Sequence, residues 1–395
     1  MYPNLYYAFK DLFGVDWKFL RFVNSFGFFV AIAFIVGAVI LSNEMRRKSR
    51  QGLFQYSEMQ VTVGKPASIS ELLLNFLLGF ILGYKILALF ILDSSATEDP
   101  QAFIFSTLGS WPAGIGLGLL FAGLKWYEKN KGKLPKPETR TVRIWPQDRV
   151  GEITIIALVF GLIGAKMFDI FENWSGFLKD PASYIFSPSG LTMYGGLICA
   201  ALAIWVYAAK HKISFWHLND SAAPALMLAY SIGRIGCQVA GDGDWGIRSY
   251  LANKPSFLPD WMWSFNYPHN VNESGIPIPG CIGPKYCNQL EFGVYPTPFY
   301  EVIACFILFL ILWSVRKRLK IPGLLFALYL MFNGVERFFI EKIRVNNRLD
   351  LFGFHPTQAE VISTLLFVSG LVLWITLKRR TPKVVVKEPG PGLTD

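Results

Sequence analysis

The feature that most constrains this chain is a series of apolar runs, each about twenty residues long. A helix of that length crosses the hydrocarbon core of a bilayer, which is about 30 Å thick. Only 17% of the 395 residues are charged and 52% are hydrophobic, which is more apolar than a soluble chain of this length. We therefore predict an all-α polytopic membrane protein with about nine transmembrane helices, at residues 22–42, 72–93, 107–126, 152–173, 190–209, 218–240, 298–315, 321–341 and 357–377.

The basic residues predict how these helices are oriented. Most of the 38 Lys and Arg residues fall in segments on one side of the predicted membrane, such as 46–50 and 378–380. Cytoplasmic segments carry such an excess, so we predict that the N-terminus lies outside and the C-terminus in the cytoplasm. The net charge of +10 then reflects membrane topology, and we expect no nucleic-acid partner. We expect no cleavable signal peptide, because the first apolar run is too long for one.

The predicted spans divide the chain into six segments. They are an N-terminal segment with the first span (1–47), a cytoplasmic loop with an extra two-helix unit (48–150), a first group of core spans (151–240), a periplasmic loop that caps the outer surface (241–297), a second group of core spans (298–380) and a disordered cytoplasmic tail (381–395). Cys281 and Cys287 lie in the capping loop, where an oxidising compartment allows a disulfide. The sequence leaves open whether they form one.

The extra unit resembles a later part of the same chain. Residues 71–131 match residues 152–212 at a constant offset of 81, without a gap. The matches include the pairs Gly83/Gly164, Lys85/Lys166, Asp99-Pro100/Asp180-Pro181, Ile104-Phe105-Ser106/Ile185-Phe186-Ser187 and Gly114/Gly195. Apolar composition alone does not align a lysine and an Asp-Pro pair in one register, so we infer duplication of a two-helix unit. Only the second copy carries a side chain suited to proton chemistry, Tyr194, and we interpret the first copy as scaffold.

Four basic residues fall inside predicted spans, namely Lys85, Lys166, Arg234 and Arg337. Each costs at least about 2.5 kcal/mol at a helix centre, so each needs a partner or a function. The predicted orientation brings the last three, with Tyr194, to the level of the outer-leaflet headgroups.

Each of these cations also has a purely structural interpretation. The aliphatic part of the Lys85 side chain is expected to extend so that its ammonium group reaches the membrane–water interface. Lys166 can pair with Asp169, three residues further along the helix. Arg337 has the acids Glu336 and Glu341 on its own helix. Arg234 has no acid three or four residues away and lies between glycines, an arrangement that favours a phosphate ligand.

Five segments together resemble the bacterial prolipoprotein diacylglyceryl transferase family. In chain order they are MYGGL at 193–197, GRIGC at 233–237, GDGDWG at 241–246, YPTPFYE at 295–301, and GVER at 334–337 with Glu341 and Arg344. Each segment is weak evidence alone, but the five keep the family's order and each lies at the end of a span. The resemblance covers about 20–47 and 152–378, and leaves 50–150 outside the usual seven-span pattern.

The resemblance implies a transferase in the bacterial inner membrane, with its active site toward the periplasm. It would move the diacylglyceryl group of phosphatidylglycerol to the lipobox cysteine of a prolipoprotein, giving a thioether and glycerol phosphate. The implied catalytic residues are Arg234, Arg337, Tyr194 and Glu341. The implied substrate-binding residues are Lys166, Gly195, Gly196, Gly236, Asp242, Asp244, Gly246, Tyr300, Glu301 and Arg344.

Three departures from the family pattern concern the proton acceptor. Tyr194 stands where the family usually has His, Phe26-Gly27 where it has Tyr, and Cys237 where it has Asn. A tyrosine has an ordinary pKa of about 10 and is a poor base, so we expect Tyr194 to orient a substrate. Glu341, Asp242, Asp244 and the leaving phosphate stay open as proton acceptors.

No metal-ligand or nucleotide-binding motif is present, so we expect no metal and no cofactor.

Two other functions remain as alternatives. The repeat and the intramembrane cations also suit a lipid or anion transporter, but transporter sites lie near the midplane and these residues group toward one face. A membrane scaffold that binds a partner through its loop leaves Arg234 unexplained.

Overall fold

The computed structural model describes residues 1–88, 103, 106–186, 190, 192–283, 285–346, 350 and 355–380. Nine long helices lie in these ranges, one at each predicted span. They are α2 (Ser25–Arg50), α3 (Ile69–Leu82) with its π-helical extension η2 (Gly83–Leu87), α6 (Trp111–Lys131), α7 (Val150–Glu172), α10 (Met193–Lys210), α11 (Phe215–Ala240), α12 (Thr297–Val315), α13 (Leu324–Glu341) and α14 (Gln358–Arg380). The predicted disordered tail at 381–395 lies outside the described residues, as do Asp99-Pro100, Ile104-Phe105 and Ser187 of the repeat.

Six of the nine helices are long and apolar enough to cross a membrane. These are α2, α3 with η2, α7 with the preceding turn η4 (Pro146–Arg149), α10, α12 and α14. The other three fall short for reasons visible in their sequences. α6 is rich in glycine, whereas α11 and α13 carry charged residues such as Asp220, Arg234 and Glu336. The chain is thus mostly helical and multi-pass.

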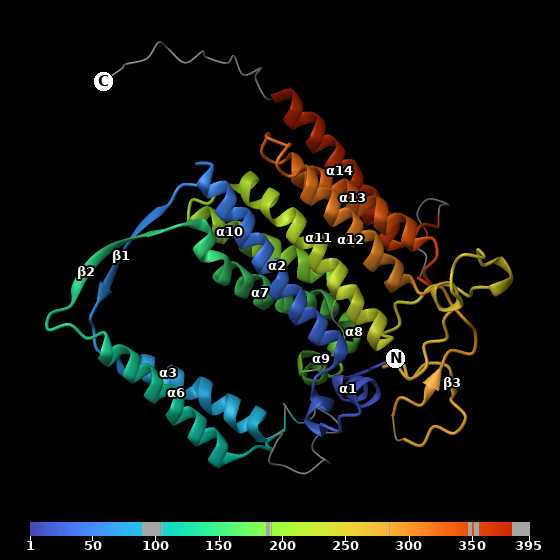
Figure 1. Cartoon of the computed structure of the whole chain (residues 1–395), viewed down its shortest axis with the longest axis horizontal. Helices are drawn as coiled ribbons and strands as arrows, with labels where there is room; N and C mark the ends of the chain where they lie inside the picture. The colour runs from blue at the N-terminus through green and yellow to red at the C-terminus, as the bar shows by residue number, and fades with distance from the viewer. Residues whose placement is uncertain are drawn as a thin grey trace.

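The core of the molecule forms around α11 (Figure 1). α2 packs along one side of α11, and α12 and α13 pack along another. Buried apolar residues join α11 to α2 and α7, including Met45, Ile153 and Leu218. A second cluster joins α11 to α12 and α13, including Met227 and Leu312. α14 then packs on α13, where Gly334 and Gly370 allow close contact of the two backbones.

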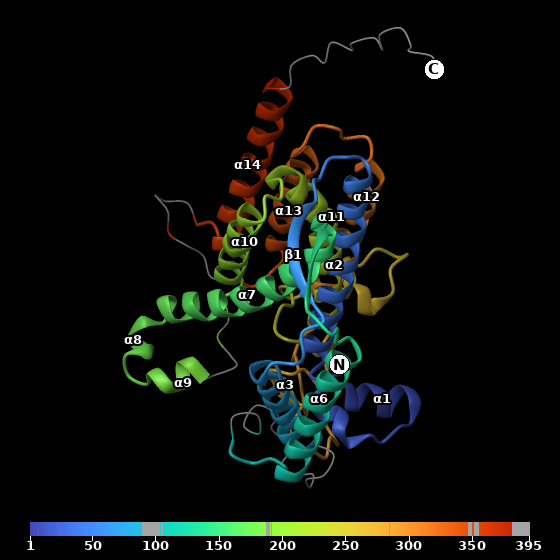
Figure 2. The same ribbon diagram turned by 90° about the vertical axis from the view of Figure 1, so that its left-hand side faces the viewer.

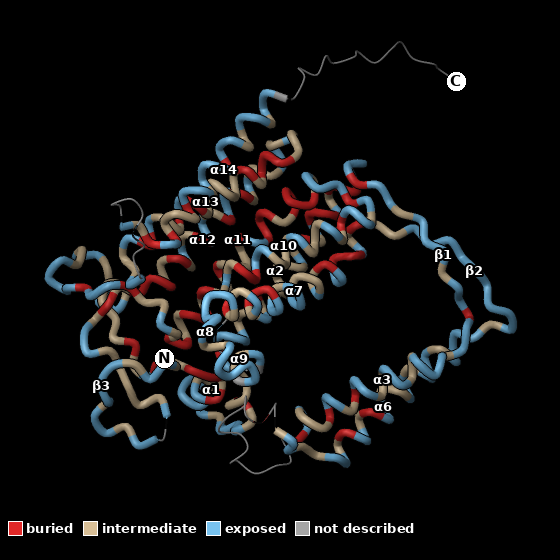
Figure 3. The backbone as a smooth tube through the Cα atoms, turned by 180° about the vertical axis from the view of Figure 1, so that it is seen from behind, coloured by how far each residue is buried: buried red, intermediate tan, exposed pale blue. Residues whose placement is uncertain are grey.

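Much of the surface of the helices is exposed (Figure 3). Many of the exposed residues are large and apolar. Examples are Ile35 on α2, Leu162 on α7, Val206 on α10 and Leu365 on α14, each more than half exposed. A soluble protein does not leave so many apolar groups in contact with water. These faces are typical of helices that contact lipid.

A buried ionic network ties the helices together at the end opposite the N-terminus. The Asp220 carboxylate accepts hydrogen bonds from the backbone N–H groups of Gly323 (2.9 Å) and Phe326 (3.0 Å), at the start of α13. Lys48 Nζ lies 3.6 Å from the same carboxylate. Asp220 therefore caps α13 from α11 and fixes the turn between α12 and α13.

A β-ribbon that the sequence analysis did not predict carries the extra two-helix unit. β1 (Ser57–Val63) pairs antiparallel with β2 (Glu138–Ile144), and Ser57 lies opposite Ile144. The sequence analysis placed a cytoplasmic loop and the extra unit here and named no strands. The alternation of Met59, Val61 and Val63 with polar residues was the readable signal. Figure 1 shows the ribbon arching away from the bundle, with α3 and α6 at its far end.

Both repeat copies fold as a pair of tightly packed helices. In the first copy α3 packs on α6, and in the second α7 packs on α10 (Figure 2). The equivalent glycines, Gly83 and Gly164, each lie against the partner helix so closely that an added Cβ would clash with a backbone carbonyl. Two short helices, α8 (Trp174–Phe177) and α9 (Pro181–Phe186), connect α7 to α10.

The remaining described segments cluster near the N-terminus. α1 (Leu5–Phe13) and the 3₁₀ turn η1 (Lys18–Phe22) precede α2. The segment 241–297 is mostly irregular, with the turns η5 (Leu251–Asn253) and η6 (Asp260–Met262) and the strands β3 (Ile276–Pro277) and β4 (Asn288–Gln289).

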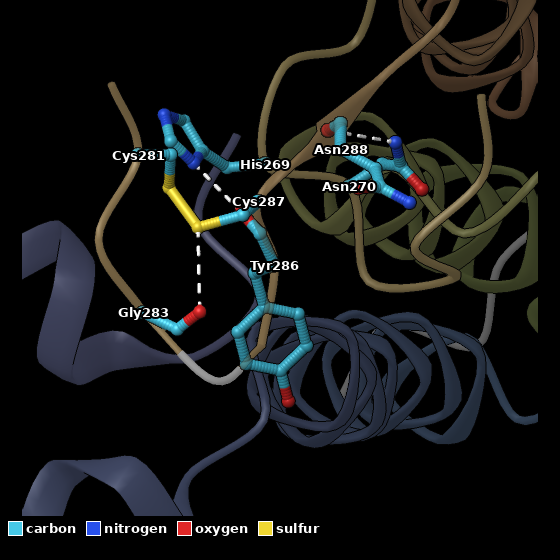
Figure 4. Close-up of a disulfide and its surroundings, with 7 residues drawn as sticks. All are labelled: His269, Asn270, Cys281, Gly283, Tyr286, Cys287 and Asn288. Atoms are coloured by element: carbon cyan, nitrogen blue, oxygen red, sulfur yellow. Dashed lines mark hydrogen bonds between the residues drawn. A yellow bond between two sulfur atoms is a disulfide. The ribbon is translucent and has the colours of Figure 1, made fainter. Parts of the chain in front are cut away.

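A disulfide closes one loop of this segment (Figure 4). It joins Cys281 to Cys287, which answers the question that the sequence left open. His269 Nδ1 lies 2.8 Å from the Tyr286 carbonyl oxygen, and Asn270 donates to the Asn288 carbonyl (3.3 Å). The disulfide and these contacts fold the loop onto itself.

Candidate functional site

The candidate site is built around Arg234, in the last third of α11. Only 8% of the residue is exposed. Its Nη2 donates to Glu301 Oε1 at 2.8 Å, and its Nη1 donates to Asp244. The sequence showed no acid near Arg234 on its own helix, which is correct. Its acidic partners, Glu301 and Asp244, come from other segments of the chain.

Glu301, near the start of α12, is the centre of the site. The residue is fully buried, yet it has four polar neighbours. Besides Arg234, its Oε1 accepts from Arg337 Nη1 (3.0 Å) and from the Tyr230 hydroxyl (3.2 Å), and lies 3.9 Å from Arg344 Nη1. One carboxylate therefore gathers three guanidinium groups that are far apart in the sequence. The prediction that Arg234 and Arg337 come together is confirmed.

Asp244 and Glu341 balance the remaining positive charge. Asp244 accepts from Arg234 and Arg344. Glu341 Oε2 lies 3.3 Å from Arg337 Nη2, and its Oε1 accepts from Asn346 Nδ2 at 2.6 Å. Three guanidinium groups thus face three carboxylates, which offsets the cost of burying the charges.

Backbone pairing holds the loop residues in place. Gly246 forms an antiparallel bridge with Arg344, and Ile247 N–H donates to the Ile343 carbonyl at 2.8 Å. An added Cβ at Gly246 would lie 2.6 Å from that same carbonyl oxygen, so glycine is required for the approach. The Thr297 hydroxyl donates to the Asp244 carbonyl at 2.5 Å. The loop after α11 is therefore fixed to the ends of α12 and α13.

The two loop aspartates differ in electrostatic environment. Burial raises the pKa of the Asp244 carboxyl, but the charges of Arg234 and Arg344 outweigh burial and hold that pKa below its ordinary value. Burial, together with the nearby charge of Asp244, raises the pKa of the Asp242 carboxyl above its ordinary value. Asp244 is therefore a fixed anion, whereas Asp242 is the better proton acceptor of the two.

Tyr194 lies on a different part of the fold, in the first turn of α10. Among the described residues, the structure records no hydrogen bond or ion pair between Tyr194 and the arginine cluster. The side chain is partly buried and belongs to the α7–α10 pair. The predicted convergence of Tyr194 with the two arginines, and the role of Tyr194, therefore stay predictions.

The predicted substrate-binding residues of α7 and α10 have structural contacts. Gly195 and Gly196 face α7, where an added Cβ would lie 2.6 Å and 2.8 Å from the carbonyl oxygens of Gly164 and Gly161. Lys166 Nζ donates to the Gly190 carbonyl (3.4 Å) and lies 3.8 Å from Asp169. These contacts give both glycines a packing role and agree with the pairing of Lys166 and Asp169.

Two further predicted residues also pack or bind within the protein. An added Cβ at Gly236 would lie 3.1 Å from Phe29 of α2, so this glycine lets α2 approach α11. The Tyr300 hydroxyl donates to the Met262 carbonyl at 2.6 Å, which joins α12 to the segment 241–297.

Four residues of the site region were not predicted as site residues. Tyr230, Thr297 and Asn346 contact the cluster directly, and Glu336 is buried beside Arg337. Tyr230 was the most readable of these, because it precedes Arg234 by one helical turn. The others depend on contacts between distant segments.

One group of described residues offers ligand atoms to a metal. The Cys237 thiol and the carboxylates of Asp242 and Asp244 have atoms within 4.8 Å of one another. Asp244 already accepts from two arginines, whose charge opposes a bound cation. The group therefore fits a metal poorly.

The chain matches one protein family over most of its length. The model of the prolipoprotein diacylglyceryl transferase family matches residues 113–376. The phosphatidylglycerol–prolipoprotein diacylglyceryl transferase of Clostridium novyi (strain NT) is 29% identical over 231 residues, which are 58% of this chain and 79% of that protein. The enzyme of the same name from Shouchella clausii (strain KSM-K16) is 29% identical over 233 residues, which are 58% of this chain and 75% of that protein.

A third relative extends over more of the chain. Phosphatidylglycerol–prolipoprotein diacylglyceryl transferase 2 of Clostridium perfringens (strain 13 / Type A) is 27% identical over 263 residues, 66% of this chain and 87% of that protein. The family match begins inside α6. It therefore includes the second helix of the extra unit and does not reach 20–47, where the sequence analysis also expected resemblance.

Proposed function

Because the chain belongs to the prolipoprotein diacylglyceryl transferase family, we propose that it transfers the diacylglyceryl group of phosphatidylglycerol to a cysteine thiol of a prolipoprotein. The acceptor is the lipobox cysteine of the precursor. The products are a thioether on the protein and glycerol phosphate.

The observation that carries this proposal is the arrangement of Arg234, Arg337 and Arg344 around Glu301. In the reaction the thiolate sulfur attacks the glyceryl carbon, and the bond from that carbon to the phosphate oxygen breaks. The departing phosphate gains negative charge as the bond breaks. Guanidinium groups held in a low-dielectric site stabilise such charge strongly, and they form bidentate bonds to phosphate oxygens.

The carboxylates keep the guanidinium groups in place before the lipid arrives. A phosphate and a carboxylate offer similar oxygen atoms to an arginine. The Asp244 carboxylate is partly exposed, whereas Glu301 is fully enclosed. We therefore propose that the lipid phosphate replaces the Asp244 carboxylate as a partner of the guanidinium groups. Glu301 stays in place and positions these groups.

The proton of the incoming thiol requires an acceptor. A cysteine thiol has an ordinary pKa of about 8.5, and nearby positive charge lowers it. Of the candidates considered, Asp244 and Glu341 are engaged by arginines, whereas the pKa of Asp242 is raised. We favour Asp242 as the acceptor and Tyr194 as a residue that orients the thiol.

We further propose a nine-span topology with the N-terminus outside and the C-terminus in the cytoplasm. The site would then face the periplasm, and the protein would reside in the bacterial inner membrane. Two observations support this orientation. The segment 241–297 carries a disulfide, which is typical of an oxidising compartment, and it lies at the same end of the helices as the arginine cluster.

The lipid or anion transporter is the less favoured alternative. The family match argues for an enzyme, and the cluster lies at the ends of α11, α12 and α13 rather than at their middles. A transport site near the midplane is the usual arrangement in transporters.

A transfer assay tests the proposal directly. Purified protein is given labelled phosphatidylglycerol and a lipobox peptide, and labelled peptide is measured. We expect wild type to form the product, and Arg234→Ala to lose at least about a hundredfold in kcat, the usual effect of removing one charge-stabilising donor. Arg143→Ala, which alters an exposed arginine of β2, serves as the control. Absence of product from well-folded wild type would reject the transferase proposal.

A further inference from the structure

A polar pocket lies at the end of the bundle opposite the candidate site. It has a volume of about 410 Å³, within the usual range of about 300–1,000 Å³ for small-molecule sites. The β-ribbon that carries the extra unit joins the bundle at this end (Figure 1). The pocket is lined from the last turns of α2 and from the turn where η4 begins, by Arg46, Ser49, Arg50, Trp145 and Gln147. Of the residues that the structure describes, no Asp or Glu lines it.

The two arginines of the pocket differ from the other cations at the end of α2. Arg47 pairs with Glu44 at 2.8 Å, and Lys48 Nζ lies 3.6 Å from a carboxylate of α11. Arg46 and Arg50 are exposed, and the described part of the chain supplies neither with an acidic partner. They lie one helical turn apart, a spacing at which like charges repel. An anion bound between them removes this repulsion.

The rest of the lining adds hydrogen-bond donors without negative charge. The Ser49 hydroxyl donates to Gln147 Oε1 at 2.7 Å. This bond occupies the amide oxygen and leaves the amide NH₂ group as a donor to a ligand. The Trp145 ring packs against Tyr56 with the ring centroids 5.4 Å apart, so that it forms a fixed wall. Two guanidinium groups and a neutral donor are the partners that an oxyanion requires.

The depth of the pocket corresponds to the headgroup layer of a bilayer. The apolar part of α2 extends to Leu41, and Arg46 lies five residues further on, about 7.5 Å along the helix. The headgroup layer on each side of the hydrocarbon is about 5–8 Å thick. Trp and Tyr side chains are enriched at this level, in agreement with the pairing of Tyr56 and Trp145.

We propose that this pocket binds a phosphate group, with Arg46 and Arg50 as its charged partners and the Gln147 amide as a neutral donor. Guanidinium groups form bidentate bonds to phosphate oxygens. The headgroup of an anionic phospholipid and free inorganic phosphate both present this chemistry. The bound phosphate joins the end of α2 to the segment that follows β2, and thereby fixes the base of the ribbon. This site is independent of the proposed transfer reaction, because it lies at the other end of α2 from Arg234.

Photo-crosslinking of full-length protein in detergent tests the lipid source. The probe is dioleoyl phosphatidic acid with a diazirine close to the ester of one acyl chain, and the labelled peptides are mapped. We expect label on the peptides that contain residues 46–50 and 145–147. Excess unlabelled phosphatidic acid should remove this label. Dioleoylglycerol, which has the same chains and no phosphate, should leave it.

Equilibrium dialysis with radiolabelled inorganic phosphate tests the soluble source. If the pocket takes free phosphate, wild type in lipid-free detergent binds one phosphate more than a double variant that combines Arg46→Gln with Arg50→Gln. If it takes only the lipid headgroup, dialysis shows no difference and excess inorganic phosphate leaves the lipid label in place.

Substitutions separate a defined site from general attraction to a basic surface. Arg46→Gln and Arg50→Gln should each weaken phosphate binding about tenfold, the worth of one hydrogen bond to a charged group. Lysine at either position keeps the charge and should weaken binding less. Arg143→Gln removes the same charge from an exposed arginine of β2 that lies 3.8 Å from Glu58, and should leave binding unchanged. Both pocket arginines are exposed, so the variants should fold.

Three results would overturn the inference. The first is wild-type labelling and wild-type phosphate binding in the double variant. The second is equal displacement of the probe by dioleoylglycerol, which would show that the acyl chains carry the binding. The third is an equal loss in Arg143→Gln, which would show that the whole basic surface attracts the probe.

Discussion

The two helix pairs of the repeat share a packing contact and differ in their surroundings. In both pairs a glycine at the same register, Gly83 or Gly164, lets the helices touch. The α7–α10 pair also contacts α2 and α11 of the core, whereas the α3–α6 pair is joined through the β1–β2 ribbon and stands apart in Figure 1. The comparison teaches that the glycine contact is enough to pack two helices against each other. Contacts outside the pair decide whether the pair can become part of a functional site.

The equivalent lysines show the same difference on a smaller scale. Lys85 Nζ donates to three backbone carbonyls, those of Phe103 (2.9 Å), Ser106 (2.6 Å) and Leu108 (2.8 Å). It therefore binds the connection between its own two helices, and the expectation that it extends to the interface stays a prediction. Lys166 Nζ donates to the Gly190 carbonyl (3.4 Å) and lies 3.8 Å from Asp169 Oδ2 on its own helix. The first lysine thus binds its own connecting segment, whereas the second pairs with an acid one helical turn away.

The largest difference between the two copies in their effect on transfer activity is expected for substitutions of the packing glycines. Gly164→Leu should abolish transfer, because the added side chain clashes with α10 and displaces a pair that is part of the core. Gly83→Leu should disrupt α3 and α6 and leave at least half of the activity. Transfer activity and thermal unfolding in detergent check both. Equal loss of activity in the two variants would break the comparison.

A smaller difference is expected at Tyr194, whose equivalent in the first copy is Ala113. Tyr194→Phe should lower kcat about 10- to 100-fold if the hydroxyl orients the thiol, without changing the shape of the pH profile. The matched control is Tyr84→Phe, which removes a hydroxyl bonded to the Thr107 carbonyl in the first copy and should leave kcat unchanged. A total loss of turnover in Tyr194→Phe would rule out a purely orienting role.

The equivalent lysines should affect different quantities. Lys166→Met is expected to raise KM for phosphatidylglycerol roughly tenfold, the worth of one charged hydrogen bond. Lys85→Met should leave KM unchanged and increase proteolysis of the α3–α6 unit, because it removes three bonds to the connection. Steady-state kinetics and limited proteolysis distinguish these outcomes. An unchanged KM in Lys166→Met would assign that lysine to structure as well.

The smallest effect is expected from removing the first copy altogether. Ser57 and Ile144 are neighbours across the ribbon, so residues 58–143 can be replaced by an Asn-Gly turn without moving either end far. We expect the shortened protein to retain transfer within about twofold, since the core helices pack without α3 and α6. Loss of activity in a folded protein would show that the extra unit takes part in the reaction.

The identities of the site residues were predictable from the sequence, whereas their contacts were not. The sequence indicated Arg234, Arg337, Arg344 and Glu301 through their motifs. It gave no means of finding that Glu301 is enclosed by all three arginines, because its partners lie 36 to 67 residues away in the chain. The sequence also gave no sign that the buried Glu336 carboxyl group lacks a hydrogen-bond partner among the described residues. This depends on how α13 is rotated against its neighbours.

The sequence by itself determined the helices, the register of the repeat and the identity of the intramembrane cations. Each follows from local physics: a long apolar run must form a helix in lipid, and a buried charge must be rare and placed for a purpose. The tertiary structure decided the partners of Arg234, the pairing of β1 with β2, and the enclosure of Glu301 by three arginines. These depend on contacts between segments distant in the chain, and periodicity along the chain carries no information about which distant segments will meet.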